Sequence, residues 1–277
     1  MLLRENTKKK KKKNPTAVIE VVLLDFFLRF ILKILPVLQF SAYLCRMIRK
    51  NIIFFTALCL CMLTATAQAQ HVSYRSTAHY NKRVAQFERE GGINENSIVM
   101  LGNSLTENGK NWAERLGMDN VVNRGIIGDN TIGMTERLCQ ITPHKPKVIF
   151  LMAGINNMVN DAPCIDVAQQ VIGLIEAIRQ QTPNTKLIVE SLLPINEKSG
   201  RWRTLAGRTD DIPLTNMYIR AYCESNDITF VDLFHLMTYP TSNMLRDELS
   251  YDGLHITEAG YEIWAKEIKR QLNHWER

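Results

Sequence analysis

Short runs of Val, Ile and Leu recur along this chain, with amphipathic stretches between them. The apolar runs show little polar alternation and lie at residues 98–101, 121–123, 148–152, 187–190 and 229–233. The amphipathic stretches have helical spacing and lie at residues 78–90, 131–141, 167–178, 215–225 and 257–272. Unbroken apolar runs are typical of parallel strands that are covered on both faces. Repeated strand–helix units therefore predict an α/β fold with a five-stranded parallel sheet and helices on both faces.

The segment before this pattern has the layout of a secretory signal peptide. Residues 47–50 are basic, residues 51–63 are mostly apolar, and Ala67-Gln68-Ala69 is a small-residue cleavage site. The apolar stretch is about a dozen residues, whereas a membrane span needs roughly 20. We therefore expect residues 47–69 to be removed, export to a bacterial periplasm or the exterior, and no stable membrane insertion afterwards.

Residues 1–46 allow two interpretations. They contain six consecutive lysines at residues 8–13 and then an apolar segment that is broken by charges and by Pro36. One interpretation is a basic tail that binds nucleic acid or a membrane. We favour the other, in which translation starts at Met47 rather than Met1 and residues 1–46 are an upstream extension, because a signal peptide belongs at an N-terminus.

The remaining 208 residues, 70–277, suit a single domain with a sizeable core. The whole chain has 34 Lys and Arg against 28 Asp and Glu, but this domain has 22 against 25, a net charge of −3. It therefore gives no electrostatic reason to expect nucleic-acid binding. Its three cysteines, Cys139, Cys164 and Cys223, are widely spaced and show no metal-ligand pattern, and one disulfide among them stays open.

Polar motifs follow the first three predicted strands, and a fourth motif precedes the last helix. Ser104 follows the first strand, Gly128 the second and Asn156 the third, while Asp252 and His255 lie just before the final helix. Because ligands bind beyond the carboxyl ends of the strands in an open α/β sheet, we expect these groups to meet at one edge. A serine, a histidine base, a carboxylate and turn-borne donors are the parts of an acyl-transfer site.

The four motifs, in this order and spacing, resemble the blocks of the GDSL, or SGNH, family of esterases and acylhydrolases. The family's Gly-Asp-Ser-Leu stands here as Gly-Asn-Ser-Leu at 102–105, and Gly128 matches its oxyanion glycine. Its Gly-x-Asn-Asp stands as Gly-Ile-Asn-Asn at 154–157, and its Asp-x-x-His as Asp-Gly-Leu-His at 252–255. The resemblance implies a three-layer, flavodoxin-like fold.

The resemblance also implies roles for these residues. His255 would take the proton of Ser104, Asp252 would orient His255, and no metal or organic cofactor would be needed. The N–H groups of Ser104 and Gly128 and the side chain of Asn156 would form the oxyanion hole.

This chain departs from the family pattern at two positions: Asn103 and Asn157 stand where the family has Asp. Because Asn keeps an acceptor but carries no charge, we expect a rearranged loop network with catalysis retained.

The sequence constrains the type of reaction more than it constrains the substrate. Residues 195–213 are polar and irregular, and a connection of this length is either functional or disordered. Trp202 within it is a candidate to contact a sugar or an anionic group, with Asn103 and Asn157 as further candidates. Glu107 either touches substrate or belongs to a solvated helical turn, and we expect His235 to be structural.

Export and this polar segment favour a secreted serine esterase that removes short acyl groups, acetyl above all, from carbohydrate. Three alternatives remain on the same fold: a lysophospholipase- or thioesterase-type acylhydrolase, an acyltransferase with an alcohol acceptor, and a non-catalytic carbohydrate-binding protein. The sequence does not indicate an oligomeric state.

Overall fold

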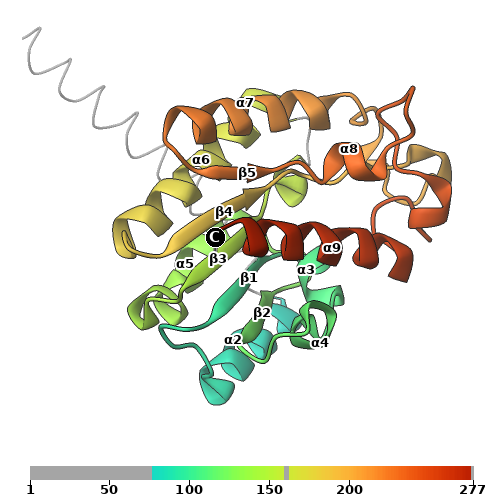
Figure 1. Cartoon of the computed structure of the whole chain (residues 1–277). Coiled ribbons are helices and arrows are strands. Elements are labelled where there is room, and N and C mark those ends of the chain that lie inside the picture. The colour runs from blue at the N-terminus through green and yellow to red at the C-terminus, as the bar shows by residue number, and fades with distance from the viewer. Residues whose placement is uncertain (1–76, 159–161, 276–277) are drawn as a thin grey trace, which may run out of the picture. The chain divides into compact units, whose positions relative to one another are not determined.

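The fold is built on a sheet of five parallel strands in the order β2-β1-β3-β4-β5 (Figure 1). The computed structural model describes residues 77–158 and 162–275, so the expected signal peptide and the upstream extension lie outside the described residues. The strands are β1 (Ile98–Gly102), β2 (Val121–Gly125), β3 (Val148–Met152), β4 (Lys186–Glu190) and β5 (Thr229–Val231). The α-helices are α2 (Ala78–Glu90), α3 (Ser104–Asn108), α4 (Trp112–Leu116), α5 (Thr131–Glu136), α6 (Cys164–Gln181), α7 (Asp211–Ser225), α8 (Phe234–Met237) and α9 (Glu258–Trp275).

The sheet confirms the predicted fold class and contains a reversal of strand order at β1. The chain continues from β1 to β2 on one side and then to β3 on the other, so Met100 is paired with both Asn123 and Phe150. In open α/β sheets, ligands bind beyond the carboxyl ends of the strands at such a reversal. The sheet therefore directs attention to the residues that follow β1, β2 and β3.

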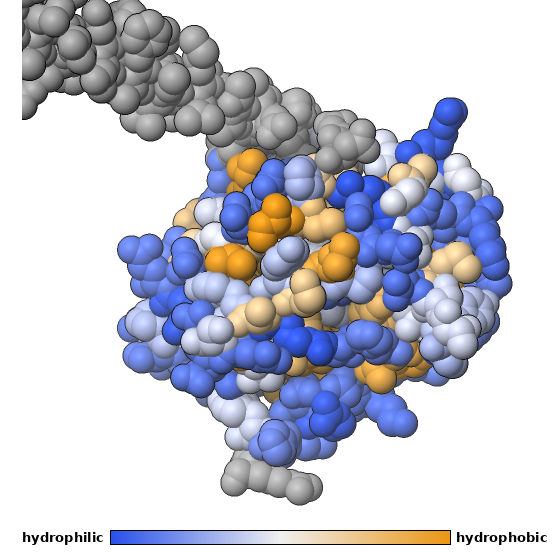
Figure 2. All heavy atoms as spheres, turned by 90° about the horizontal axis from the view of Figure 1, so that it is seen from above, coloured by the Kyte–Doolittle hydropathy of each residue, from blue (hydrophilic) through white to orange (hydrophobic). Residues whose placement is uncertain are grey.

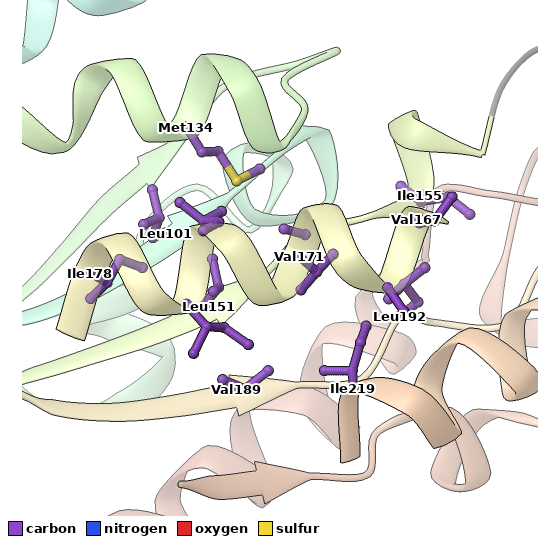
Figure 3. Close-up of a cluster of buried hydrophobic side chains, with 14 of the residues drawn as sticks. Leu101, Met134, Leu151, Ile155, Val167, Val171, Ile178, Val189, Leu192 and Ile219 are labelled. Carbon is purple, nitrogen blue, oxygen red and sulfur yellow. The ribbon is translucent and has the colours of Figure 1, made fainter. Parts of the chain in front are cut away.

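The two faces of the sheet bury separate apolar clusters. Val99 and Leu101 of β1 belong to the cluster with α5, α6 and α7, whereas Ile98 and Met100 belong to the cluster with α4 and α9. Figure 3 shows α6 lying along the first cluster, with Val171 among the side chains close to the strands. Because successive side chains of a strand point to opposite faces, unbroken apolar strands produce these three layers.

The cluster on the α9 side contains aromatic rings that pack against one another and borders a buried carboxyl group. Trp112 of α4 and Trp264 of α9 pack edge to face with their ring centroids 4.9 Å apart. The indole N–H of Trp264 donates to Glu190 at the end of β4, at 2.6 Å. Burial raises the pKa of Glu190 to about 8, so this carboxyl group is mostly protonated at neutral pH.

Two segments differ from the sequence-based expectation. The predicted helix at 131–141 is split, because α5 ends at Glu136 and a 3₁₀ turn (Arg137–Gln140) follows. A tightened last turn is common where a helix ends, and Pro143, which has no backbone N–H, lies just beyond. The segment 195–213 is folded rather than disordered, since it forms two 3₁₀ turns (Glu197–Ser199 and Arg203–Leu205) and buries Leu205.

The surface of α6 and α7 carries several exposed apolar side chains. Figure 2 looks down on the side of α7 and shows such side chains separated by polar ones. The exposed large apolar or aromatic residues of these two helices are Ile165, Leu214, Met217 and Tyr218. Among the described residues, no helix combines the length and the apolar composition that crossing a bilayer requires.

The three cysteines of the domain, Cys139, Cys164 and Cys223, are free.

Candidate active site

Ser104 is the first residue of α3, directly after β1. Gly102 is needed for this tight connection, because a Cβ at that position would lie 2.0 Å from the hydroxyl oxygen of Thr106. The side-chain oxygen of Asn103 caps the helix by accepting from the N–H of Leu105 at 2.9 Å. The backbone N–H of Ser104 lies in the first turn, where it has no partner within the helix.

Buried aromatic side chains hold the short helix α3 in place. The Tyr261 hydroxyl donates to the carbonyl of Leu105 at 2.8 Å, and the Trp112 indole donates to that of Thr106 at 2.9 Å. A helix of one turn is not stable by itself, so tertiary bonds of this kind fix its orientation. The position of Ser104 thus depends on the core under α4 and α9.

His255 and Asp252 lie in the turn before α9, and His255 contacts Ser104. His255 Nε2 lies 3.0 Å from Ser104 Oγ, and His255 Nδ1 lies 2.8 Å from Asp252 Oδ2. Because an ionised carboxylate only accepts hydrogen bonds, Nδ1 carries the proton and Nε2 faces the serine hydroxyl as an acceptor. This is the hydrogen-bonding order of a serine–histidine–aspartate triad.

The Asp252 carboxylate is buried but remains ionised. Burial alone would raise its pKa, but bonds from the His255 side chain and from the N–H groups of His255 and Leu254 outweigh it, and the pKa is lowered. Those two N–H groups donate to Asp252 Oδ1 at 2.7 and 3.0 Å. The turn therefore supplies the charge that stabilises a protonated imidazole.

The turn after β2 presents Gly128. The N–H of Asp129 donates to the carbonyl of Ile126 at 3.0 Å, and Gly128, the third residue of this turn, has φ 82°. A turn with a positive φ at its third residue favours glycine there. The backbone conformation of the turn is therefore one physical reason for glycine at 128.

Asn156 follows β3 and is bound to the same turn. Its side-chain N–H₂ donates to the backbone carbonyl of Asp129 at 2.8 Å. An amide nitrogen has two hydrogens, so one remains to point at a substrate. Ser104, Gly128 and Asn156 therefore stand at the carboxyl ends of three adjacent strands, as the sequence predicts.

A buried ion pair connects the turn after β2 to the end of β1. The Asp129 carboxylate accepts from Arg137 Nε at 2.7 Å, and Arg137 Nη2 donates to the carbonyl of Gly102 at 3.1 Å. Both side chains are almost fully buried. Burial raises the pKa of Asp129 to about 6, against the lowering effect of the Arg137 charge. Loss of either partner would leave an uncompensated charge in the interior.

The two positions that depart from the family pattern lie inside the protein. Asn103 is 1% exposed and Asn157 is 9% exposed. Asn157 donates to the Thr131 hydroxyl at 2.7 Å and accepts from the Thr131 N–H at 3.3 Å. Both side chains therefore belong to the framework of the site, and their role as candidates for substrate contact stays a prediction.

Two aromatic side chains flank the imidazole. The Trp202 ring packs edge-on against His255 at 5.2 Å between centroids, and Tyr251 lies nearly parallel to it at 6.3 Å. Trp202 is half-buried, whereas Tyr251 is 64% exposed. The structure thus brings Trp202 to the site, as predicted from sequence, and adds Tyr251.

Sequence reasoning missed Asp129, Arg137 and Tyr251 as parts of the site. Asp129 could have been suspected because it directly follows the candidate oxyanion glycine, and Tyr251 because it precedes the Asp252 motif. Arg137 gave no signal, since a cation within an amphipathic helix is normally solvated. The Glu107 carboxylate, whose side chain is 15% exposed, accepts from the N–H of Ile127 at 2.6 Å and so holds the turn that carries Gly128.

The arrangement suits acyl transfer through a serine. It combines a hydroxyl, a base with a fixed tautomer, an ionised carboxylate and N–H donors at the ends of three strands. In the described part of the chain, no group of three or more His, Cys, Asp or Glu side chains could hold a metal ion.

The fold and these groups together define a hydrolase that acts on ester bonds. A model of the GDSL-like Lipase/Acylhydrolase family matches residues 100–263, and the chain belongs to this family. The matched span starts within β1 and ends within α9, so it includes every residue of the site described above.

The chain is also similar in sequence to individual acetylhydrolases. Platelet-activating factor acetylhydrolase IB subunit alpha2 of Homo sapiens is 33% identical over 172 residues, which cover 60% of this chain and 72% of the relative. The same subunit of Rattus norvegicus is 28% identical over 174 residues, with the same coverage of both chains.

Solved structures show the same fold. A GDSL-like lipase from Bacteroides thetaiotaomicron matches with a TM-score of 0.60 at 22% identity, covering 71% of this chain and 98% of that one. A Streptococcus pneumonia protein described in relation to platelet activating factor matches with a TM-score of 0.61 at 25% identity, covering 76% and 99%.

Proposed function

We propose that this protein is an exported serine esterase that removes short acyl groups, acetyl in particular, from carbohydrate hydroxyls. The observation that carries the proposal is the chain of hydrogen bonds from Ser104 through His255 to Asp252, at 3.0 and 2.8 Å. The leader at residues 47–69 supports export, and the family supports ester hydrolysis.

The mechanism follows from these positions. Ser104 Oγ attacks the ester carbonyl while its proton passes to His255 Nε2, and Asp252 stabilises the imidazolium. The N–H groups of Ser104 and Gly128 and the Asn156 amide receive the negative charge of the tetrahedral oxygen; one such donor typically contributes about 2.7–4 kcal/mol. The C–O bond to the alcohol breaks as His255 returns the proton to the leaving oxygen. Water, deprotonated by His255, then hydrolyses the acyl-serine.

The carbohydrate part of the proposal rests on the aromatic side chains beside the base. The alcohol leaves toward His255, so its remaining atoms come close to Trp202 and Tyr251. Sugar rings present C–H faces that pack on aromatic rings and hydroxyls that need polar partners. The exposed Arg201 and Arg203 on either side of Trp202 supply such partners.

The acetyl part of the proposal is supported by the curated relatives, which are named acetylhydrolases. Their names also favour a second candidate, the removal of acetyl from a phospholipid. Exposed Ile127, next to Gly128, offers apolar surface beside the site that such a substrate could cover. The two candidates share the acyl group and differ in the alcohol.

Hydrolysis of p-nitrophenyl esters of increasing chain length, by wild type beside Ser104→Ala, tests the proposal. We expect the rate to be highest on acetate, to fall with chain length and to be lost in the variant. Rates that rise with chain length would assign the site to longer acyl chains. Equal rates in both proteins would contradict the catalytic role of Ser104 and favour a binding protein.

Two further assays separate the alternatives that share this chemistry. Release of acetate from acetylated xylo- or manno-oligosaccharides, compared with release from a short-chain phospholipid, distinguishes the two alcohols. Formation of an acetylated sugar when a free sugar is added would indicate acyl transfer rather than hydrolysis. A fluorophosphonate probe that labels wild type but not Ser104→Ala would exclude the non-catalytic alternative.

A further inference from the structure

Helix α2 packs against the turn that carries the candidate oxyanion donor, although it lies outside the residues that the family model matches. The model starts at residue 100, whereas α2 ends at Glu90. Tyr80 and Phe87 of α2 form a small buried cluster with Ile126, which is 0% exposed. In Figure 1, α2 lies beside β2 at the lower edge of the sheet. The surface that covers this turn is therefore supplied by a helix that precedes the residues matched by the family model.

Glu107 of α3 connects this helix to the turn. One carboxylate oxygen accepts from the N–H of Ile127, the residue before Gly128, at 2.6 Å. The same carboxylate lies 3.0 Å from His79 Nε2 and 3.4 Å from Arg83 Nε, both on α2. Its side chain is only 15% exposed, so these contacts are partly shielded from water.

Arg83 adds a second connection to the same segment. Its Nη2 donates to the carbonyl of Gly125 at 3.2 Å, and its guanidinium lies 4.5 Å over the ring of Phe87. Three consecutive residues are thus held: Gly125 through its carbonyl, Ile126 through its side chain, and Ile127 through its N–H. Each of these contacts involves α2 or the Glu107 side chain that α2 holds.

We propose that Arg83 and Glu107 are positioning residues for the reaction, and that α2 fixes the turn after β2 so that the Gly128 N–H points at the oxyanion. The inference rests on the proposed function, because it assumes that Gly128 is an oxyanion donor. A donor helps only if it is already oriented when charge develops, so a turn that rotates freely loses part of its effect. Displacements of about 1 Å at such groups can cost about 100-fold in rate.

The test compares Arg83→Met with Arg89→Met, which makes the same change at an exposed position of the same helix. Both variants and wild type are assayed on p-nitrophenyl acetate and with a trifluoromethyl ketone, which forms a tetrahedral adduct with an active-site serine. We expect Arg83→Met to lower kcat about 10- to 100-fold with little change in KM, and to weaken ketone binding by a similar factor. Arg89→Met should behave as wild type.

Glu107 provides an internal comparison. The amide oxygen of Glu107→Gln can still accept from the Ile127 N–H, whereas Glu107→Ala cannot. We therefore expect Glu107→Gln to retain much more kcat than Glu107→Ala. Equal losses in the two variants, or a loss that appears only in KM, would overturn the positioning role.

Hydrogen exchange at the Ile127 amide separates this inference from the proposed function. We expect faster exchange at Ile127 in Glu107→Ala and Arg83→Met but not in Arg89→Met, since the bond that protects this amide is weakened. Unchanged exchange together with unchanged kcat would overturn the inference even where Ser104→Ala abolishes activity. Activity that survives in Ser104→Ala would instead contradict the proposed function, and the exchange data would still show whether α2 holds the turn.

Discussion

The sequence Asp-x-x-His occurs twice in this chain, and the two segments make the same Asp–His hydrogen bonds in very different surroundings. In the first, His235 Nδ1 lies 2.7 Å from Asp232, and in the second, His255 Nδ1 lies 2.8 Å from Asp252. In each turn the histidine backbone N–H also donates to the aspartate. The motif therefore builds an oriented imidazole by local hydrogen bonding alone.

What differs is the far side of each ring. The His255 side chain is 14% exposed and its Nε2 faces Ser104, whereas the His235 side chain is 70% exposed. Asp232 also pairs with Arg220, so its charge is shared with a cation, while the Asp252 carboxylate accepts from the N–H groups of Leu254 and His255 and from the His255 ring. The comparison teaches that a serine opposite the base and exclusion of water, rather than the Asp–His pair, make one turn suitable for catalysis.

The largest expected effect contrasts His255→Ala with His235→Ala. Without its base, Ser104 cannot lose its proton efficiently, so we expect His255→Ala to lower kcat by about 10⁴-fold or more. We expect His235→Ala to stay within about twofold of wild type, because a surface substitution away from the site seldom matters. Initial rates on p-nitrophenyl acetate measure both. A comparable loss in the two variants would remove the distinction between the turns.

Asp252→Asn and Asp232→Asn form the next pair. An amide at 252 can no longer stabilise the imidazolium and also permits the wrong tautomer, so we expect kcat to fall by about 10²- to 10⁴-fold. Asp232→Asn should leave kcat unchanged while it loosens His235 and Arg220. Steady-state kinetics with circular dichroism as a check on folding would measure this, and wild-type activity in Asp252→Asn would disprove the assigned role.

The residue after each aspartate sharpens the comparison further. Gly253 has φ 88°, and a Cβ there would lie 2.2 Å from the carbonyl of Asn196, whereas the equivalent Leu233 is fully buried. We expect Gly253→Ala to destabilise the fold by about 1–3 kcal/mol and also to lower kcat, because the turn that carries His255 must shift. Leu233→Ala should cost about 2–5 kcal/mol of stability and leave kcat nearly unchanged. Urea unfolding and kinetics of both variants would show whether the loss of stability and the loss of kcat occur independently.

The smallest expected effect concerns pH. Burial would raise the pKa values of Asp252 and Asp232, but hydrogen bonds from the neighbouring histidines outweigh it, and both pKa values are lowered. Each carboxylate therefore adds stability above the unfolded pKa, near 3.9, and that contribution is lost as the pH falls through the lower folded pKa. Unfolding free energies of wild type and of each Asp→Asn variant should converge as the pH drops below about 4. A gap that is constant with pH would contradict the lowered pKa values.

Much of the architecture could be predicted from the sequence, because buried parallel strands need unbroken apolar runs. β3 matches its predicted range, and the other strands differ by one or two residues at their ends. Helix ends were less well predicted: α6 starts at Cys164, three residues before the predicted helix, because the side chains of its first turn are exposed or half-buried and fall outside the buried apolar stripe. Such ends depend on tertiary contacts that no local pattern records.

The groups of the site were predicted as a set, but their supports were not. Ser104, Asn156 and His255 stand out because each follows a strand or precedes a helix in a short motif. The Asp129–Arg137 pair and the contact of Glu107 with α2 join residues whose burial depends on the completed fold. An arginine or glutamate in a helix has the same appearance in sequence whether it is solvated or holds a distant backbone group.

The nucleophile and the base are contributed by opposite ends of the folded chain. Ser104 follows the first strand of the sheet, and His255 stands 151 positions later, just before the final helix. During synthesis Ser104 is therefore made before His255, the base that activates it. Until His255 has been made and folded into place, the nascent chain cannot hydrolyse esters. Recovery of esterase activity after denaturation should accordingly lag behind recovery of helical signal, since activity requires contacts of high sequence separation, which are slow to form.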